Sequence, residues 1–378
     1  MGVKFIEQTG LTYDDVLIVP KRSSVRSRRE VSLSTRLVGD LTLELPIVSA
    51  NMDTVTELRM AQAMHAAGGL GVIHRFIPDA GLHSQWVSET PGIRILAVGV
   101  KASDLARIPM VSGLHGVLID VAHGHSDRVL ETIAVIRDRH PDLWVIGGNV
   151  ATAEGAWDLL EAGAHAVKVG VGPGAVCTTR IVTGCGVPQL SAVVKVKAAI
   201  SRWWDVERRK ANPRLKQRPT LIADGGIRNS GDIVKALVAG ADTVMIGSLF
   251  AGTDEAPGEV IERGGEQVKL YRGMASEGAM RVVGADRTPE GVSTYLPYKG
   301  PMARLLAELE GGIRSGLSYC NSGSIADLHE QTIELVRITQ ASLRESHPHA
   351  TSRHLVSSSV EDTTSNKAEV YRAPSSGS

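Results

Sequence analysis

Eight short apolar runs recur along the chain, with helical stretches between them. The runs do not alternate between apolar and polar positions, which is typical of strands that helices cover on both faces. Eight strands that alternate with helices predict an α/β fold, a closed (β/α)8 TIM barrel. The runs span residues 46–50, 70–74, 95–99, 117–120, 144–148, 166–170, 220–224 and 243–247.

The length of the chain fits this prediction. A barrel of this kind needs roughly 250 residues, and the chain has 378. The structural alternative is a doubly wound open sheet, but the GxGxxG turn that usually follows its first strand is missing. The sequence SANMD at 49–53 stands there instead. A weak repeat between 162–170 and 239–247, each a helix end followed by a short strand, also favours the barrel.

Two segments fall outside this rhythm of strands and helices. Residues 201–219 are basic and contain two tryptophans, so we expect a solvated helix and loop, with a contact to a partner or subunit as the alternative. From 345 to 378 the chain is rich in Ser and Thr and loses its periodicity. This composition predicts a disordered tail after a single barrel domain at 1–344.

Composition excludes several classes of function. Lys+Arg and Asp+Glu both total 41 and the pI is about 7.2, so no overall field attracts nucleic acid or an anionic membrane. We find neither a membrane span nor the apolar centre of a signal peptide, and we expect a cytoplasmic protein. Cys177, Cys185 and Cys320 are too few for a disulfide framework and are expected to be free thiols.

The segment after the sixth run, VGVGPGAVCTTRIVTGCGVPQ at 169–189, is the strongest candidate for chemistry. In a barrel it lies at the rim that carries active sites. Gly170, Gly172 and Gly174 allow the backbone to approach a ligand, and Cys177 lies on the loop that they shape. A lone cysteine is more often a small buried residue. The surrounding Gly and Thr residues favour a nucleophile here.

Two glycine turns follow the seventh and eighth runs. Barrels often bind phosphate at this place through backbone N–H groups, and Gly225 and Gly226 form one turn while Gly247 and Ser248 form the other. Asp224 ends the seventh run, where its carboxylate can accept hydrogen bonds from a ribose diol. Together the two turns predict a phosphorylated ligand.

Six motifs resemble the IMP dehydrogenase/GMP reductase family: SANMDTVTE, DVAHGHS, GVGPGAVCTTR, TGCGVPQLSAV, IADGGI and YRGMAS. The resemblance covers roughly residues 5–337. It implies the barrel fold, a purine mononucleotide substrate, a nicotinamide cofactor and a homotetramer. The tandem regulatory domains that many members insert between the second helix and third strand are expected to be absent, because only residues 75–94 lie there.

The resemblance also implies roles for individual residues. Cys177 would be the nucleophile that adds to C2 of the purine, and Thr179 would assist the leaving group. Backbone carbonyls of Gly172, Gly174 and Cys177 would bind a monovalent cation, expected to be K+. The other implied contacts are Met52, Met274 and Glu290 to the base, Asp224 to the ribose, Gly226, Gly247, Ser248 and Tyr271 to the phosphate, and Asp120 and Asn149 to the nicotinamide or the reacting edge of the base.

The two enzymes of the family share a covalent thioimidate at C2. The resemblance favours GMP reductase, which releases ammonia from GMP and uses NADPH to give IMP. Glu277 matches the glutamate that works with the Thr179 hydroxyl in reductases, Asn51 resembles the reductase loop, and residues 281–290 lack the Arg-Tyr pair with which dehydrogenases activate water.

Other features resemble the dehydrogenases, namely HGHS after Asp120, Val187 and Arg272. The first alternative is therefore an IMP dehydrogenase without regulatory domains, which would oxidise IMP to XMP with NAD. A nucleotide-binding regulator with weak catalysis is the second, because Ala175 replaces a serine that usually contacts phosphate and the segment 281–290 is short. Ala275, which replaces a small glycine or serine near the base, is a departure from both enzymes. The sequence does not distinguish NADPH from NADH.

Overall fold

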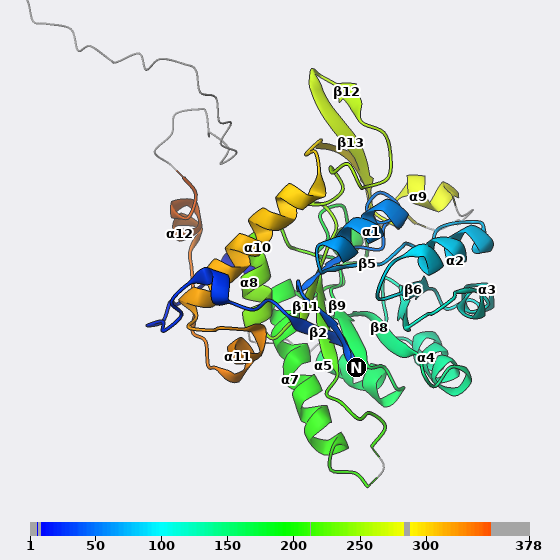
Figure 1. Cartoon of the computed structure of the whole chain (residues 1–378), viewed down its shortest axis with the longest axis horizontal. Coiled ribbons are helices and arrows are strands. Elements are labelled where there is room, and N and C mark those ends of the chain that lie inside the picture. Colours follow the sequence, from blue (N-terminus) through cyan, green and yellow to red (C-terminus); the bar gives the residue numbers. More distant parts are fainter. Residues whose placement is uncertain (1–5, 7–8, 212, 283–287, 349–378) are drawn as a thin grey trace, which may run out of the picture. The chain divides into compact units, whose positions relative to one another are not determined.

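The computed structural model describes the chain except for residues 1–5, 7–8, 212, 283–287 and 349–378. Its first compact unit ends at Arg337 and is built on one parallel sheet with the strand order β5-β4-β11-β10-β9-β8-β7-β6 (Figure 1). Because the last of these strands, β11, pairs with the first, β4, the sheet curls into a TIM-like barrel. The strands are β4 (Ile47–Ser49), β5 (Leu70–Gly71), β6 (Ile95–Val98), β7 (Gly116–Ile119), β8 (Trp144–Val150), β9 (Ala166–Val169), β10 (Thr220–Asp224) and β11 (Thr243–Ile246).

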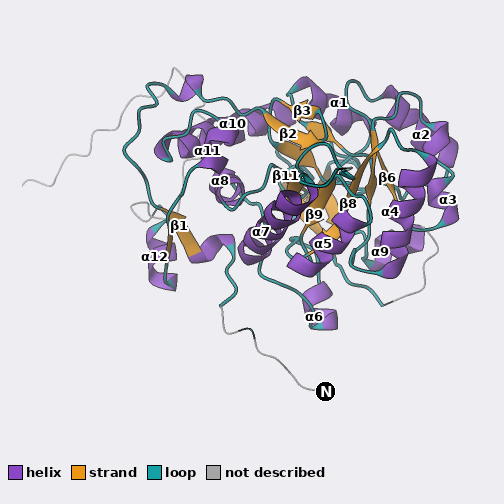
Figure 2. Ribbon diagram, turned by 90° about the horizontal axis from the view of Figure 1, so that it is seen from below, coloured by secondary structure: helices purple, strands orange, loops and turns teal. Residues whose placement is uncertain are grey.

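Helices lie on the outside of this sheet and bury its strands (Figure 2). Several begin at a polar residue whose side chain accepts a hydrogen bond from the first helical turn, as Asp79, Thr152 and Asn229 do. The helices of the barrel are α1 (Leu58–Ala66), α2 (Ala80–Glu89), α3 (Ala102–Leu105), α4 (Asp127–Arg139), α5 (Ala153–Glu161), α6 (Thr179–Thr183), α7 (Gln189–Glu207) and α8 (Ser230–Val238).

A hairpin of β2 (Thr35–Val38) and β3 (Leu41–Leu43) closes the end of the barrel at which the strands begin. The Thr220 hydroxyl, at the start of β10, donates to the Leu37 carbonyl at 2.5 Å. The Thr35 hydroxyl donates to the carbonyl of Asp242, just before β11, at 2.7 Å. Leu37 and Val38 are fully buried there. A ligand must therefore enter from the opposite end, where the strands finish.

The remaining elements extend this core. An antiparallel sheet of β12 (Ile261–Arg263), β13 (Glu266–Arg272) and β14 (Ser293–Pro297) projects from it (Figure 1), with α9 (Glu277–Val282) between its last two strands. β1 (Val16–Ile18) pairs with β15 (Leu335–Arg337), so the two ends of the unit lie together. Short 3-10 turns (Tyr13–Asp15, Arg28–Glu30, Ile108–Met110), α10 (Met302–Tyr319) and α11 (Ile325–Glu330) complete the unit. The second unit contains α12 (Gln340–Glu345).

The eight strands predicted from apolar runs are all present, although β5 ends at Gly71 rather than at residue 74. The expected helix and loop at 201–219 is also found, since α7 continues to Glu207. Trp203 in it is only 1% exposed and donates to Glu161 at 2.7 Å, so this tryptophan belongs to the core rather than to a solvated surface. Residues 349–378 of the predicted tail lie outside the described residues.

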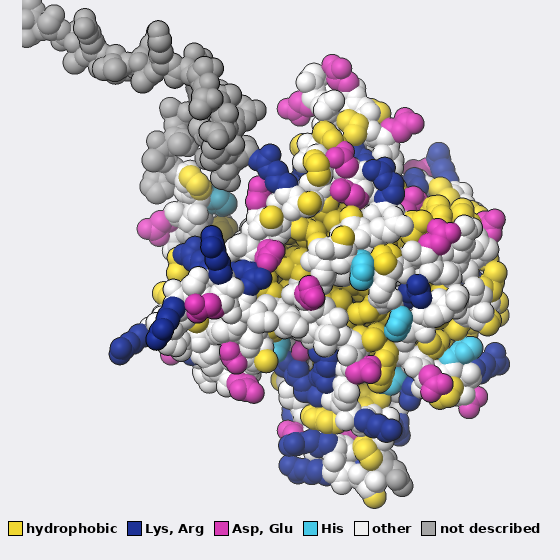
Figure 3. Space-filling view, viewed as in Figure 1, with side chains coloured by type: hydrophobic (Ala, Val, Ile, Leu, Met, Phe, Trp, Pro, Cys, Tyr) yellow, Lys and Arg dark blue, Asp and Glu magenta, His cyan; other side chains and the backbone are white. Residues whose placement is uncertain are grey.

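The surface carries interspersed charges of both signs, as the balanced composition predicts (Figure 3). Basic side chains gather around the end of α7 and the loop after it, where Arg202, Arg208, Arg209, Lys210, Arg214 and Lys216 are exposed. None of the helices in the described part of the chain is both long and apolar enough to cross a membrane.

Candidate active site

A cavity of about 260 Å³ lies at the carboxyl ends of the barrel strands. Its walls come from the segments that follow β4, β5, β7, β9 and β10, and from the stretch after β13. Active sites of α/β barrels are built from these same loops. Cys177 and Thr179, from the loop after β9, and Glu290, from the segment before β14, line one side of it.

Cys177, Thr179 and Glu290 form a continuous chain of hydrogen bonds. The Cys177 thiol donates to the Thr179 hydroxyl at 3.2 Å, and that hydroxyl donates to a carboxylate oxygen of Glu290 at 2.8 Å. Cys177 is partly exposed to the cavity, whereas Thr179 is nearly buried. Because each group gives its proton to the next, the arrangement can carry the thiol proton away from the sulfur and leave a nucleophilic thiolate.

Backbone hydrogen bonds hold Glu290 beside the nucleophile loop. The Thr178 N–H donates to the Glu290 carbonyl at 2.9 Å, and the Val292 N–H donates to the Val176 carbonyl at 3.0 Å. The Glu290 N–H in turn donates to the Ala275 carbonyl at 2.9 Å. The two segments therefore lie side by side as extended chains, and the position of the Glu290 side chain is fixed by its backbone.

A buried lysine connects two carboxylates on the other side of the cavity. Lys168 in β9 has a side chain that is only 3% exposed, and its Nζ donates to Asp224 at 2.6 Å and lies 4.0 Å from Asp120. Asn149 also donates to Asp224, at 2.8 Å. Arg75 lies 3.4 Å from Asp120 through its Nε. These contacts fix where the carboxylate oxygens of the two aspartates point.

Tyr271 in β13 and Met52 after β4 lie beside Gly247, the residue that follows β11. The Tyr271 hydroxyl lies 3.8 Å from the Met52 sulfur, and a Cβ added to Gly247 would meet both the hydroxyl and the sulfur at 2.9 and 3.2 Å. A larger residue at this position would therefore displace the Tyr271 hydroxyl and the Met52 sulfur. Burial raises the pKa of Tyr271, and the charges of Asp224 and Cys177 raise it further, so the hydroxyl remains a proton donor at neutral pH.

Comparison with known proteins assigns the chain to a family. The model of the IMP dehydrogenase / GMP reductase domain matches residues 10–89 and 92–349. The chain belongs to this family. Its members act on purine nucleotides with a nicotinamide cofactor, so this member of the IMP dehydrogenase/GMP reductase family is an oxidoreductase of purine nucleotide metabolism.

Individual relatives of this family member include both enzymes. An inosine-5′-monophosphate dehydrogenase of Halalkalibacterium halodurans is 36% identical over 91% of this chain and 96% of its own length. That of Borreliella burgdorferi is 36% identical over 91% of this chain and 98% of its own length. A GMP reductase of Leishmania donovani is 33% identical, with 91% of this chain and 97% of the relative covered.

The cavity brings together most of the residues that the sequence singled out. Gly226, Gly247 and Ser248 are not among its lining residues; Gly225 lines it instead of Gly226. One of the two turns predicted to bind phosphate therefore reaches the wall of the cavity through Gly225, whereas the turn of Gly247 and Ser248 does not line it. The predicted residues that line it are Met52, Asp120, Asn149, Gly172, Gly174, Cys177, Thr179, Asp224, Tyr271, Met274 and Glu290.

Glu277 is an exception, because the structure does not bring it together with the other predicted residues. Its side chain is 67% exposed and pairs with Arg281, one helical turn further along α9, rather than with Thr179. Glu277 does not line the cavity either. The partner of the Thr179 hydroxyl is Glu290, which the sequence analysis had assigned only to the base. The residue that most favoured the reductase over the dehydrogenase is thus not at the site.

Sequence reasoning missed Lys168 and Arg75, both of which line the cavity. A signal for Lys168 was present, because a lysine inside the apolar run AVKVG must be paired if the strand is buried. Arg75 had no such signal, since it follows its strand in a loop where charged residues are common.

The cavity also fits a nicotinamide. Asn149 and Asp120 line it beside Lys168, and the buried Asn149 Oδ1 has no hydrogen-bond partner among the residues that the structure describes. An unpaired buried acceptor suits a carboxamide or ribose donor. At the loop expected to bind a cation, the Gly174 carbonyl accepts the Cys177 N–H at 3.1 Å and keeps a second lone pair free. Among the described residues no group of three His, Cys, Asp or Glu side chains is placed to hold a metal ion.

Proposed function

We propose that the chain is an IMP dehydrogenase, which oxidises IMP at C2 and hydrolyses the product to XMP. The observation that carries the proposal is the chain of hydrogen bonds from Cys177 through Thr179 to Glu290, at 3.2 and 2.8 Å. Two further points support the dehydrogenase over the reductase. More of the similar relatives carry the dehydrogenase name, and Glu277, the main argument for a reductase, faces solvent.

The first half of the reaction uses the hydrogen-bond chain Cys177–Thr179–Glu290, called the relay below, to make Cys177 a nucleophile. As the Cys177 sulfur bonds to C2 of IMP, its proton passes to the Thr179 hydroxyl, and the hydroxyl proton passes to Glu290. A nicotinamide held beside Asp120 and Asn149 would supply the acceptor for the C2 hydrogen, which would leave as hydride. The nucleotide would then stay bonded to the Cys177 sulfur as a thioimidate. Asp224 and Tyr271, on either side of the nucleotide, would hold its ribose and phosphate meanwhile.

The second half uses the same relay as a base. Once Glu290 has released its proton to solvent, it can accept the proton of a water through Thr179 while the water oxygen bonds to C2. The bond between sulfur and C2 then breaks, XMP leaves, and the thiolate of Cys177 regains a proton. Glu290 would serve as the base for this step, since two hydrogen bonds through Thr179 connect its carboxylate to the Cys177 sulfur.

GMP reductase is the second candidate, and one observation favours it. The sequence has no tyrosine between Tyr271 and Tyr295, so the Arg-Tyr pair of the dehydrogenases has no counterpart there. Residues 283–287 of this stretch lie outside the described residues. In that reaction Glu290 would give a proton through Thr179 to the departing amine of GMP, and hydride from the reduced nicotinamide would complete IMP.

The proposal extends to the whole protein. We infer a cytoplasmic homotetramer with a bound K+ ion at the loop that contains Gly172, Gly174 and Cys177, and with NAD in the dehydrogenase or NADPH in the reductase. We also infer a catalytic domain without tandem regulatory domains, since α2 is the one helix between β5 and β6, a stretch that is described throughout.

One assay distinguishes the candidates. IMP with NAD, GMP with NADPH, and each nucleotide with the other cofactor are offered in turn while absorbance at the wavelength of reduced nicotinamide is followed. A dehydrogenase forms reduced cofactor from IMP and NAD alone, whereas a reductase consumes it with GMP. No change in any combination, with nucleotide binding retained, would leave the regulator as the remaining account and contradict both enzymatic proposals.

A further inference from the structure

The segment between β10 and α8 begins with two glycines, Gly225 and Gly226, which have no side chains with which to hold the shape of the turn. Gly225 and Gly226 both adopt positive φ angles, +90° and +81°, which side chains rarely adopt. Gly225 lines the cavity, and loops after the seventh strand of an α/β barrel commonly bind phosphate through their N–H groups. A turn of two glycines is flexible in isolation, so its shape must be fixed by the residues on either side.

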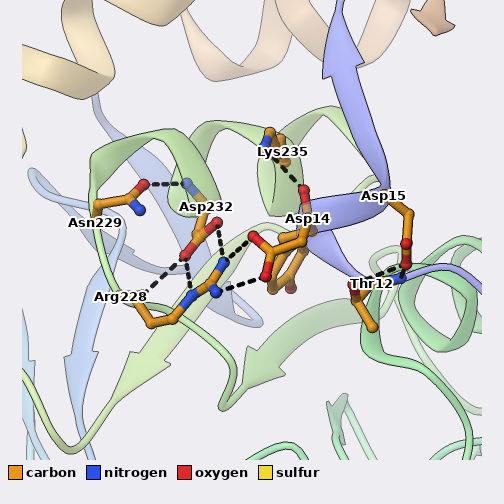
Figure 4. A network of polar contacts seen from close by, with 8 residues as sticks. Thr12, Asp14, Asp15, Arg228, Asn229, Asp232 and Lys235 are labelled. Atoms are coloured by element: carbon orange, nitrogen blue, oxygen red, sulfur yellow. Dashed lines mark hydrogen bonds and ion pairs between the residues drawn. The ribbon is translucent and has the colours of Figure 1, made fainter. Parts of the chain in front are cut away.

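Arg228, two residues after Gly226, is held by two carboxylates, those of Asp14 and Asp232 (Figure 4). Its Nη1 and Nη2 donate to the two carboxylate oxygens of Asp14 at 2.7 and 2.5 Å. Its Nε and its backbone N–H both donate to the same oxygen of Asp232 at 3.0 Å. Such a two-pronged pair fixes the plane of the guanidinium as well as its position. The end of the glycine turn is therefore tied to the N-terminal segment and to α8.

The N-terminal segment that provides Asp14 is itself anchored across the rim. Lys235 donates to the Tyr13 carbonyl at 2.8 Å, and Leu11 exchanges two hydrogen bonds with Ser191 at the start of α7. The Tyr13 ring is buried, and it lies 3.4 Å from where a Cβ on Gly226 would be. The segment therefore packs behind the glycine turn while it also holds Arg228.

We propose that Arg228 is a positioning residue for the 5′-phosphate of the nucleotide: paired with Asp14 and Asp232, it sets the shape of the Gly225–Gly226 turn. This inference rests on the proposed function, since it needs a purine mononucleotide as ligand. Arg228 itself does not line the cavity, so it acts through the turn.

The exposure of the pair separates this role from a role in stability. The side chains of Arg228 and Asp14 are 52% and 38% exposed, and exposed ion pairs contribute only about 0–1 kcal/mol to folding. Removal of the exposed pair by Asp14→Asn should leave the fold intact and loosen the turn. Arg228→Gln also removes a partner of Asp232, which is only 2% exposed, and leaves that carboxylate the N–H of residue 228 as a donor. The loss then falls on binding of the phosphate, while the Cys177 chemistry on the adjacent loop is retained.

The test measures how well a ligand protects Cys177 from alkylation, in the full chain. IMP is compared with inosine, which lacks the phosphate, on wild type, Arg228→Gln, Arg228→Lys and Asp14→Asn. Arg304→Gln is the control, because it removes an ion pair with Glu308 of similar exposure, 59% and 57%, away from the cavity. Melting temperatures are recorded for every variant, and Asp14→Asn carries the test if Arg228→Gln does not fold.

We expect Arg228→Gln to raise the half-protecting concentration of IMP about tenfold and that of inosine less than twofold. KM for IMP should rise about as much, with kcat at saturation within twofold of wild type. For Arg228→Lys, the half-protecting concentration of IMP should lie between those of wild type and Arg228→Gln, because lysine keeps the charge and loses the two-pronged geometry. Equal losses for IMP and inosine, an unchanged IMP value, or a loss in kcat alone would overturn the role of Arg228. A wild-type chain that IMP does not protect would overturn the proposed function as well.

Discussion

The Thr179 hydroxyl donates to the Glu290 carboxylate at 2.8 Å, although the two residues are 111 positions apart in the sequence. The first stands on the loop after β9, and the second on the segment between α9 and β14. Their contact completes a path for the proton of the Cys177 thiol. The dehydrogenase would use this path to move protons to Glu290, and the reductase would use it to move a proton from Glu290 to the departing amine.

Removal of the Glu290 carboxylate should slow the reaction without loss of the fold. Glu290→Gln keeps the size of the side chain and its contact to Thr179 but cannot take up a proton. General acid–base groups contribute roughly 10²- to 10⁴-fold to rates, so we expect kcat to fall at least about 10²-fold. Steady-state kinetics with saturating nucleotide and cofactor measure this, and a variant within tenfold of wild type would contradict the relay.

Glu277 provides the matched comparison. It is exposed and pairs with Arg281 on the same helix. We expect Glu277→Gln to keep kcat within about twofold and to change the free energy of unfolding by less than about 0.5 kcal/mol. The same kinetic assay and urea unfolding measure the two quantities. A large loss of kcat in this variant would show that α9 moves Glu277 into the site during turnover.

Lys168 should contribute to the stability of the folded protein. Lys168→Met leaves Asp224 without its 2.6 Å partner and removes the nearby positive charge from Asp120. Asn149 still donates to Asp224 at 2.8 Å, but the hydrogen bond from the lysine to a charged group is lost, which costs about 1.5–3 kcal/mol. The free energy of unfolding should fall by about that amount. Urea denaturation at pH 7 checks it. Unchanged stability would mean that water replaces the lysine at both aspartates.

Lys197 offers a test by pH. Burial lowers the pKa of Lys197 to about 8. The charge of Asp242 partly offsets this effect by raising the pKa, and the charges of Arg218 and Arg36 lower it further. Its Nζ has no hydrogen-bond partner in the described chain. Between pH 8 and 10.5 the unfolded chain keeps this proton and the folded chain loses it, so wild-type stability should gain from Lys197 as pH rises through this window.

Lys197→Met tests this directly. At pH 7 the variant should be more stable by about 1–3 kcal/mol, because the buried unpaired ammonium is gone. The difference between variant and wild type should shrink as pH rises from 8 to 10.5. Chemical denaturation at several pH values measures the difference, and a constant or growing gap would contradict the lowered pKa.

The barrel could be predicted from the sequence because its cause is local. Each strand is a short apolar run that helices bury on both faces, so the pattern in 166–170 or 243–247 reveals its environment without knowledge of its neighbours. The loop with Cys177 could be placed at the rim for the same reason, since it directly follows a strand. A residue that directly follows a predicted barrel strand can thus be placed at the catalytic rim from the sequence alone.

The contacts of Glu277 and Glu290 could not be predicted in this way. Both glutamates lie in the stretch after β13, and which of them meets Thr179 depends on backbone hydrogen bonds to residues 176–178 that no local pattern encodes. The orientation of α9 turns Glu277 to solvent. Arg228 is similar, because its partner Asp14 is 214 positions away.

The covalent bond at Cys177 is the central claim, and peptide mass spectrometry tests it most directly. The chain is mixed with IMP and NAD, or with GMP and NADPH, quenched in acid within one turnover and digested. We predict a mononucleotide adduct on the peptide that contains Cys177, and none in Cys177→Ala. Turnover by Cys177→Ala, or an adduct found on Cys185 or Cys320 instead, would contradict the account.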